Sequence, residues 1–263
     1  MSSSAPNPIV PAIEMTGVSL GSCDEPETAV LENIDWTVTP GEYWVIGGMH
    51  GAGKTSLLSL AAGLTAPLQG RYRLFGQEMP AKGDQFLAER LRIGLVFDNG
   101  QLFHQLTIRE NIALPLYYHR NLPEAELEKI VHTILEWAGL TPSAGSLPGA
   151  VGRAWLKRAG LARSLVLQPE VLLLDNVLSG LDSRHVHWWL EALDELAAGR
   201  TPLGSRPLTV ITAAEDLRPW RARAAQFAVL HQGRFRALGH HPQLSELDDP
   251  LLKELLAEPL PAA

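Results

Sequence analysis

A glycine-rich loop constrains the fold of this chain more than any other feature. Residues 48–55 read GMHGAGKT; the apolar, strand-like run EYWVIGG (42–48) leads into them, and the helix-like run KTSLLSLAAGL (54–64) follows. A loop of this kind curls its backbone N–H groups around an anion, and the N-terminus of the helix adds a partial positive charge. We therefore expect a strand, a phosphate-binding loop and a helix in direct succession.

Two side chains of this loop have the chemistry to hold a nucleotide and its metal ion. Lys54 is expected to reach the β- and γ-phosphates, and the Thr55 hydroxyl is expected to hold Mg²⁺. A second metal contact in such proteins comes from an aspartate that ends an apolar strand, and VLLLD (171–175) supplies Asp175. The sequence thus predicts ATP and Mg²⁺ as ligands. The loop residues predicted to contact them are Gly48, Met49, His50, Gly51, Ala52, Gly53, Lys54, Thr55 and Ser56.

Strand-like and helix-like runs alternate along the rest of the chain. AIEMTGVSL (12–20) and VLENIDWTV (30–38) have the alternation of exposed strands, PLTVIT (207–212) is a further strand, and FAVLHQGRFRAL (227–238) is typical of a hairpin with a Gln-Gly turn. Helical patterns dominate from about 98 to 164. The order predicts an α/β fold of the P-loop NTPase (RecA-like) type, with a mostly parallel sheet, antiparallel strands at the N-terminus and an inserted helical subdomain.

Composition excludes several classes of function. The net charge is −7 and the basic residues are scattered, which argues against nucleic acid as the main partner. No apolar run approaches the roughly 18 residues that a membrane span needs. The start of the chain, MSSSAPNPIVP, lacks the pattern of a secretory signal, and a single cysteine, Cys23, fits a reducing compartment. We expect a cytoplasmic protein.

Beyond these motifs, the sequence resembles the ABC transporter ATPases from about Ile13 to Glu258. The stretch VLENIDWTVTPGEYWVIGGMHGAGKTSLL is similar to their first strands and phosphate loop, and LHQGRFRALG is similar to their late hairpin. The tetrapeptide SGLD (179–182) matches their D-loop and places Asp182 in it. Within the family, the PL after ENIAL and the ending DDPLLKELL look most like the ATPases of retrograde phospholipid (Mla/Mce-type) transporters.

The resemblance implies a domain organisation and a set of partners. It implies a disordered tail at 1–11, an ABC nucleotide-binding domain at 12–240 with its helical subdomain at about 98–164, and a C-terminal helical tail at 241–263. It also implies a transmembrane permease as partner, and a homodimer or a heterodimer with another ABC ATPase subunit. The expected location is peripheral, on the inner face of the bacterial plasma membrane.

Three catalytic positions depart from the family pattern. Asn176 stands where the family has a glutamate that orients the attacking water, and an amide cannot take up a proton at neutral pH. Glu215 stands at the position of the switch histidine, and Asp98 at the glutamine of the Q-loop. Asp98 is also a candidate metal ligand. We expect nucleotide binding to survive these changes and fast hydrolysis to be lost.

Two further elements of the family pattern are degenerate. The signature serine and its two glycines align with Gly152, Arg153 and Ala154, and the adenine-stacking aromatic expected near Ser22 is missing. In a homodimer, Arg153 would face the partner subunit's γ-phosphate region and could form ion pairs across the interface. The alternative is a solvated surface arginine, because exposed ion pairs contribute little.

Two functions remain open from the sequence. The first is an ATP-binding subunit of a membrane transporter, for lipid by its subgroup, which couples dimer closure to a permease with weak or absent hydrolysis of its own. The second is a pseudo-ATPase that acts as a structural or regulatory partner of a competent paralogue. A soluble ABC protein of translation or DNA repair is disfavoured, because the chain is single and acidic. Whether the chain is an enzyme depends on turnover.

Overall fold

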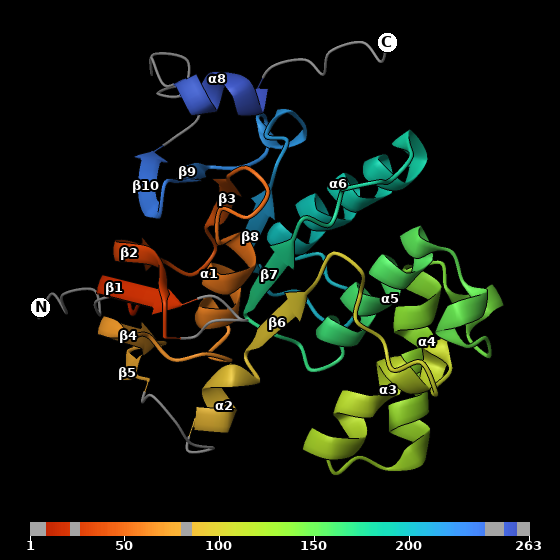
Figure 1. Cartoon of the computed structure of the whole chain (residues 1–263). Helices are drawn as coiled ribbons and strands as arrows, with labels where there is room; N and C mark the ends of the chain where they lie inside the picture. The colour runs from red at the N-terminus through yellow and green to blue at the C-terminus, as the bar shows by residue number, and fades with distance from the viewer. Residues whose placement is uncertain (1–8, 22–26, 80–85, 240–249, 257–263) are drawn as a thin grey trace, which may run out of the picture.

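The computed structural model describes residues 9–21, 27–79, 86–239 and 250–256, and Figure 1 shows their arrangement. The strands of this part of the chain form one ten-stranded sheet in the order β5-β4-β1-β2-β10-β9-β3-β8-β7-β6. In its parallel part, the strand before Glu215 lies between the strand that leads into the phosphate loop and the strand that ends at Asp175. The predicted α/β fold with an inserted helical lobe is confirmed.

The antiparallel edge of the sheet is built from strands with alternating burial. On β1, Ile13 and Met15 are buried and Thr16 is exposed, as expected of a sheet covered on one side. Its strands are β1 (Ile13–Gly21), β2 (Ala29–Val38), β4 (Gln69–Leu74) and β5 (Gln77–Glu78).

The parallel part of the sheet carries the site. Its strands β3, β7 and β8 are buried along their whole length, because helices cover both of their faces. Register pairs Gly47 with Ala214 and Asp175 with Ala213, so the three strands end at the same edge. The parallel strands are β3 (Tyr43–Gly47), β6 (Ile93–Val96), β7 (Val171–Asp175), β8 (Thr209–Ala214) and β9 (Gln226–His231). The next strand, β10 (Arg234–Gly239), forms an antiparallel hairpin with β9.

Two hydrophobic cores lie on the two faces of the sheet. Trp44 and Ile46 belong to the core beneath α1 (Lys54–Ala61), whereas Tyr43 and Val45 belong to the core that includes α6 (Ser183–Ala197). This division follows from the two-residue period of a strand. In the described part of the chain, the lobe that contains the sheet has two further short helices, α2 (Leu87–Arg90) and α8 (Pro250–Leu256).

A helical lobe of α3 (Ile108–His119), α4 (Glu124–Trp137) and α5 (Arg153–Leu165) lies beyond β6 (Figure 1). Thr107 and Glu110 form a capping box that starts α3. Asn111 is fully buried, and its amide donates to the carbonyl oxygens of Phe103, Leu106 and Thr107 at 3.0 Å each. These bonds fix the loop that leads from β6 into the lobe.

A contact between two glycines brings α5 against the loop after β6. A Cβ atom at Gly160 would lie 2.9 Å from the Cα of Gly100, and one at Gly100 would lie 2.3 Å from the Leu156 oxygen. Glycine inside a helix costs about 1 kcal/mol relative to alanine. The close approach of the two backbones explains why the helix carries it.

Lys157 joins the lobe to the sheet through ionic and polar contacts. Its side chain is fully buried, and its ammonium donates to Asp98 Oδ1 at 2.6 Å and to the carbonyl oxygens of Ser179 at 2.6 Å and Val177 at 3.1 Å. Burial lowers the pKa of Lys157, and Asp98 opposes that shift. One side chain therefore connects α5, the loop after β6 and the segment after β7.

Most element boundaries agree with the sequence patterns, and the differences are local. The expected strand at 207–212 runs from Thr209 to Ala214, and β5, α2 and the three 3₁₀ helices of the described residues were not anticipated. Most of the expected tail at 1–11 lies outside the described residues, as does the C-terminal segment at 241–263 apart from α8. In the described part of the chain, no helix has the length and apolar character needed to cross a membrane.

Replacement of Lys157 by methionine tests the joint between the lobes. Lys157→Met is expected to lower the free energy of unfolding by about 3 kcal/mol, because it leaves Asp98 short of a cation and buried carbonyl oxygens short of a donor. The exposed Lys129 on α4 gives the matched control, and Lys129→Met should change stability by less than about 0.5 kcal/mol. Urea unfolding at neutral pH measures both. Equal stabilities of the two variants would contradict the role given to Lys157.

Candidate functional site

The loop of residues 48–53 has the backbone conformation of an anion cradle. Gly51 and Gly53 have φ angles of 77° and 90°, a region that favours glycine, and α1 begins directly after them. The first N–H groups of a helix lack partners within the helix, so those of α1 are available to an anion. Lys54 is buried, and its ammonium donates to the carbonyl oxygens of Gly48 at 2.7 Å and Met49 at 2.8 Å. The loop is therefore shaped for phosphate.

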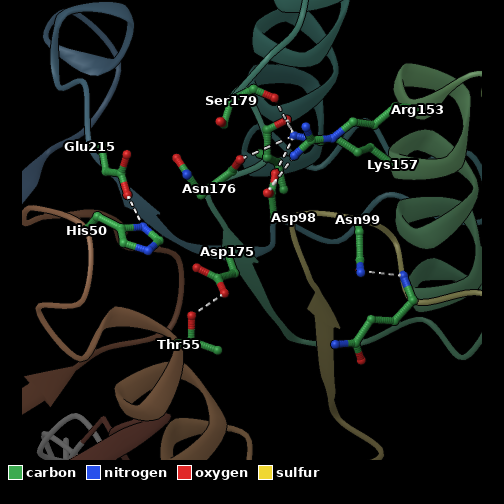
Figure 2. Close-up of polar contacts among 12 residues, drawn as sticks. His50, Thr55, Asp98, Asn99, Arg153, Lys157, Asp175, Asn176, Ser179 and Glu215 are labelled. Atoms are coloured by element: carbon green, nitrogen blue, oxygen red, sulfur yellow. Dashed lines mark hydrogen bonds and ion pairs between the residues drawn. The ribbon is translucent and has the colours of Figure 1, made fainter.

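Thr55 and Asp175 form the second part of the site. The Thr55 hydroxyl donates to Asp175 Oδ2 at 2.6 Å, and Figure 2 shows the pair between the phosphate loop and the end of β7. Burial raises the pKa of Asp175, while the Thr55 bond and the Lys54 charge oppose that shift. Hydroxyl and carboxylate oxygens are the ligands that Mg²⁺ prefers, so the two residues fit the metal contact predicted for them.

A cleft of about 470 Å³ brings together many of the predicted site residues, although Gly48, Met49 and Ala52 of the loop are not among its lining. Its volume is in the range of small-molecule pockets, and its walls come from five separate segments of the chain. It is lined by Val30, His50, Gly51, Gly53, Lys54, Thr55, Ser56, Asp98, Asp175, Asn176 and Glu215. The phosphate loop fits the phosphates of a nucleotide, and the other lining residues determine whether the cleft can hydrolyse them.

Glu215 lies beside the phosphate-binding lysine. Its Oε1 atom is 3.4 Å from the Lys54 ammonium and 3.5 Å from Nδ1 of His50. His50 is almost wholly exposed, and the Glu215 side chain is 41% exposed. A carboxylate therefore occupies the position that the family resemblance gives to a histidine.

Asn176 follows Asp175 directly and takes an unusual backbone conformation. Its φ angle is 49°, in the left-handed region, and its N–H donates to the Ala213 oxygen at 2.9 Å. Its side chain lines the cleft, and its carbonyl oxygen is 3.4 Å from the Lys157 ammonium. Asn176 can donate and accept hydrogen bonds here, but it cannot act as a general base at neutral pH.

Asp98 lines the cleft but is held by two cations of its own chain. Arg153 Nη2 donates to its Oδ2 at 2.8 Å, and Lys157 donates to its Oδ1 at 2.6 Å (Figure 2). The Arg153 side chain is 56% exposed and pairs with Asp98 of its own chain, and an ion pair with a partner subunit stays a prediction. Asp98 remains a carboxylate with both oxygens engaged, which weakens it as a metal ligand.

The signature and D-loop residues lie at the N-termini of α5 and α6. Gly152 is the N-cap of α5, and Arg153 and Ala154 form its first turn. Asp182 caps α6 by accepting from the His185 N–H at 3.0 Å, and this bond lowers the pKa of Asp182. Neither Asp182 nor the signature residues line the cleft. The position of the missing adenine-stacking residue, Ser22, lies outside the described residues.

Sequence reasoning missed a second polar joint behind the site. The Arg158 guanidinium lies 4.6 Å from the ring of Trp155 and 3.8 Å from that of Trp188, and its Nη2 is 3.0 Å from His185 Nδ1. Burial lowers the pKa of Arg158 to about 10. Lys157 and Arg158 are buried in α5 and are followed by the buried apolar residues Ala159 and Leu161. Two charged residues next to an apolar run in a helix are the signal that could have indicated buried polar contacts, although not their partners.

Comparison with known proteins agrees with this geometry. The family model described as "ABC transporter" matches residues 31–179. The chain is 34% identical over 207 residues to the methionine import ATP-binding protein MetN 2 of Paraburkholderia xenovorans, which covers 78% of this chain and 52% of that protein. It is 29% identical over 228 residues to the intermembrane phospholipid transport system ATP-binding protein MlaF of Escherichia coli, which covers 86% of this chain and 82% of that one. The chain thus spans about half of the methionine import protein and most of MlaF.

Solved structures show the same fold. CbiO1 from Clostridium perfringens, part of the ABC transporter complex CbiONQ, superimposes with a TM-score of 0.73 at 24% identity over 90% of this chain and 91% of that one. A dimeric bacterial ABC transporter cassette gives a TM-score of 0.74 at 25% identity over 84% and 95% of the two chains. The family match covers more than half of the chain and includes the phosphate loop and Asp175. The chain belongs to the ABC transporter family, as one of its ATP-binding domains.

Proposed function

We propose that this chain is the nucleotide-binding subunit of a membrane ABC transporter, and that it holds ATP and Mg²⁺ with weak or absent hydrolysis at its own site. One contrast within the cleft carries the proposal. Lys54, Thr55 and Asp175 have the arrangement needed to bind, whereas Asn176 and Glu215 replace the groups needed for turnover. The family membership supplies the transporter context.

The loss of turnover follows from the chemistry of three side chains. Removal of a general base typically lowers the rate by about 10²–10⁴-fold, and Asn176 provides none. Asp98 is a candidate replacement in the same cleft, but Arg153 and Lys157 donate hydrogen bonds to both of its carboxyl oxygens. Glu215 adds negative charge beside Lys54, where negative charge must accumulate during phosphoryl transfer. Each change acts against hydrolysis.

A groove beside the helical lobe is the proposed contact with the permease. It has a volume of about 480 Å³ and is lined from both sides by β6 residues and by α3 residues. Phe103 and Tyr118 belong to its lining and are 54% and 77% exposed. Exposed aromatic side chains at a concave surface are typical of protein interfaces. Docking there would place the subunit at the cytoplasmic face of the bacterial inner membrane.

Phospholipid is the proposed transport substrate. MlaF matches this chain over most of both sequences, whereas the methionine import protein, although 34% identical, contains a large part that this chain does not match. The sequence itself points to the same subgroup through ENIALPL (110–116) and DDPLLKELL (248–256). We propose dimerisation as part of this function, because a cassette of the same fold is dimeric.

A pseudo-ATPase that pairs with a competent paralogue is the second candidate. The observation that favours it is the ion pair of Arg153 with Asp98 at the start of α5. A signature of small residues lets a backbone approach a partner's phosphate, whereas Arg153 fills this position with a long side chain that is already paired. Such a chain would contribute little to a partner's active site and would act by stabilising or regulating the complex.

Removal of the Lys54 ammonium tests nucleotide binding. Lys54→Ala is expected to weaken binding of MgATP by at least about 100-fold, because a buried cation that contacts phosphate contributes about 3 kcal/mol or more. Calorimetric titration measures the dissociation constants, and Lys129→Ala on the exposed side of α4 is the control with unchanged affinity. Equal affinities of wild type and Lys54→Ala would refute nucleotide binding at this cleft.

A charge placed in the groove tests the permease contact. Tyr118→Glu is expected to release most of the chain from membranes of its source cells, because it places a charge in a contact that excludes water. His132→Glu adds the same charge on the exposed side of α4 and should leave the membrane-bound fraction unchanged. Quantification of the chain in membrane and soluble fractions measures the effect. Retention of Tyr118→Glu on the membrane would place the contact elsewhere.

A further inference from the structure

Glu215 gives the nucleotide cleft an anion of its own. The Lys54 ammonium has two carbonyl oxygens at 2.7 and 2.8 Å and one carboxylate oxygen, Glu215 Oε1, at 3.4 Å. In a phosphate loop, the lysine contacts the β- and γ-phosphates. Here, a protein carboxylate stands among the partners of this lysine, so a bound terminal phosphate would have to share Lys54 with it.

The other two carboxylates of the cleft are engaged elsewhere. Asp98 is bound by Arg153 and Lys157, and Asp175 accepts from the Thr55 hydroxyl. Glu215 is the carboxylate of the lining that faces Lys54, with His50 on its exposed side. Asp216, the next residue, pairs instead with Arg218 at 2.6 Å. Glu215 is therefore the carboxylate in direct contact with Lys54, whereas Asp175 acts on it only through its charge.

We propose that Glu215 takes the place of a terminal phosphate at Lys54, so that the cleft selects nucleoside diphosphates over triphosphates. The inference rests on the proposed function, because it concerns the same nucleotide cleft. In the diphosphate complex, Lys54 lies between the β-phosphate and the Glu215 carboxylate, and opposite charges alternate. In the triphosphate complex, the γ-phosphate and Glu215 compete for the same ammonium.

The size of the effect follows from charge and exposure. A triphosphate brings about one more negative charge than a diphosphate, and like charges a few ångströms apart repel strongly at a protein surface. The Glu215 side chain is 41% exposed, so water and salt weaken this repulsion. We expect the remaining repulsion to change the ratio of ATP to ADP affinity about tenfold, which corresponds to about 1.4 kcal/mol.

Titration of the purified full chain with MgADP and with MgATP tests the inference. The wild type should bind ADP more tightly than ATP, and equal or tighter binding of ATP would contradict selection of diphosphates. Glu215→Gln keeps the shape of the side chain and removes its charge, so it should raise the ratio of ATP to ADP affinity about tenfold. Asp216→Asn removes the neighbouring charge, which Arg218 already balances, and should leave the ratio unchanged. If Glu215→Gln does not fold, Glu215→Ala provides the same comparison.

The outcomes separate this inference from the function on which it rests. A wild type that binds neither nucleotide would overturn both the proposed function and the inference. Binding of both nucleotides, with a ratio that Glu215→Gln and Glu215→Ala leave unchanged, would overturn the inference alone. A ratio that rises in the Glu215 variants and stays constant in Asp216→Asn would support it, because a general loss of stability changes both affinities together.

Discussion

The Lys157 ammonium ties together the parts of the molecule on which the cleft depends. It is buried, and it contacts Asp98 after β6, the carbonyl oxygens of Val177 and Ser179 after β7, and through Asp98 also Arg153 at the start of α5. A buried ammonium is tolerated only when its hydrogen bonds and charge are satisfied, so these segments are held in one arrangement. The position of Asp98 in the cleft and the orientation of the helical lobe both follow from this constraint.

Under the proposed function, the groups for nucleotide binding and the groups for turnover lie on different segments. The binding groups Lys54, Thr55 and Asp175 lie on the phosphate loop and β7, which the buried sheet positions without help from the lobe. The groups that would assist hydrolysis lie on the connecting loops, and there Asp98 is already paired and Asn176 is an amide. The proposed loss of hydrolysis therefore leaves nucleotide binding possible, because the two depend on different segments.

The sequence predicted those features that depend on local pattern. The phosphate loop, the apolar strand that ends at Asp175 and the hairpin at Gln232–Gly233 are set by short-range periodicity and turn chemistry, and the structure has them where they were expected. The partners of Arg153 could not be predicted, because they depend on how α5 packs against a loop 55 residues earlier in the chain. Lys157 was missed for the same reason: its four acceptors come from two distant loops.

Hydrolysis of ATP under single-turnover conditions distinguishes nucleotide binding from catalysis in this cleft. The chain is mixed in excess with γ-labelled MgATP, and samples are quenched with acid over several hours. We expect almost all of the bound nucleotide to be recovered as ATP, and the rate of phosphate release to equal that of Lys54→Ala. A double variant, Asn176→Glu with Glu215→His, supplies a base and a donor and should release phosphate faster than the wild type. Rapid release by the wild type that disappears in Lys54→Ala would show that other residues of this cleft catalyse hydrolysis, and would contradict the account.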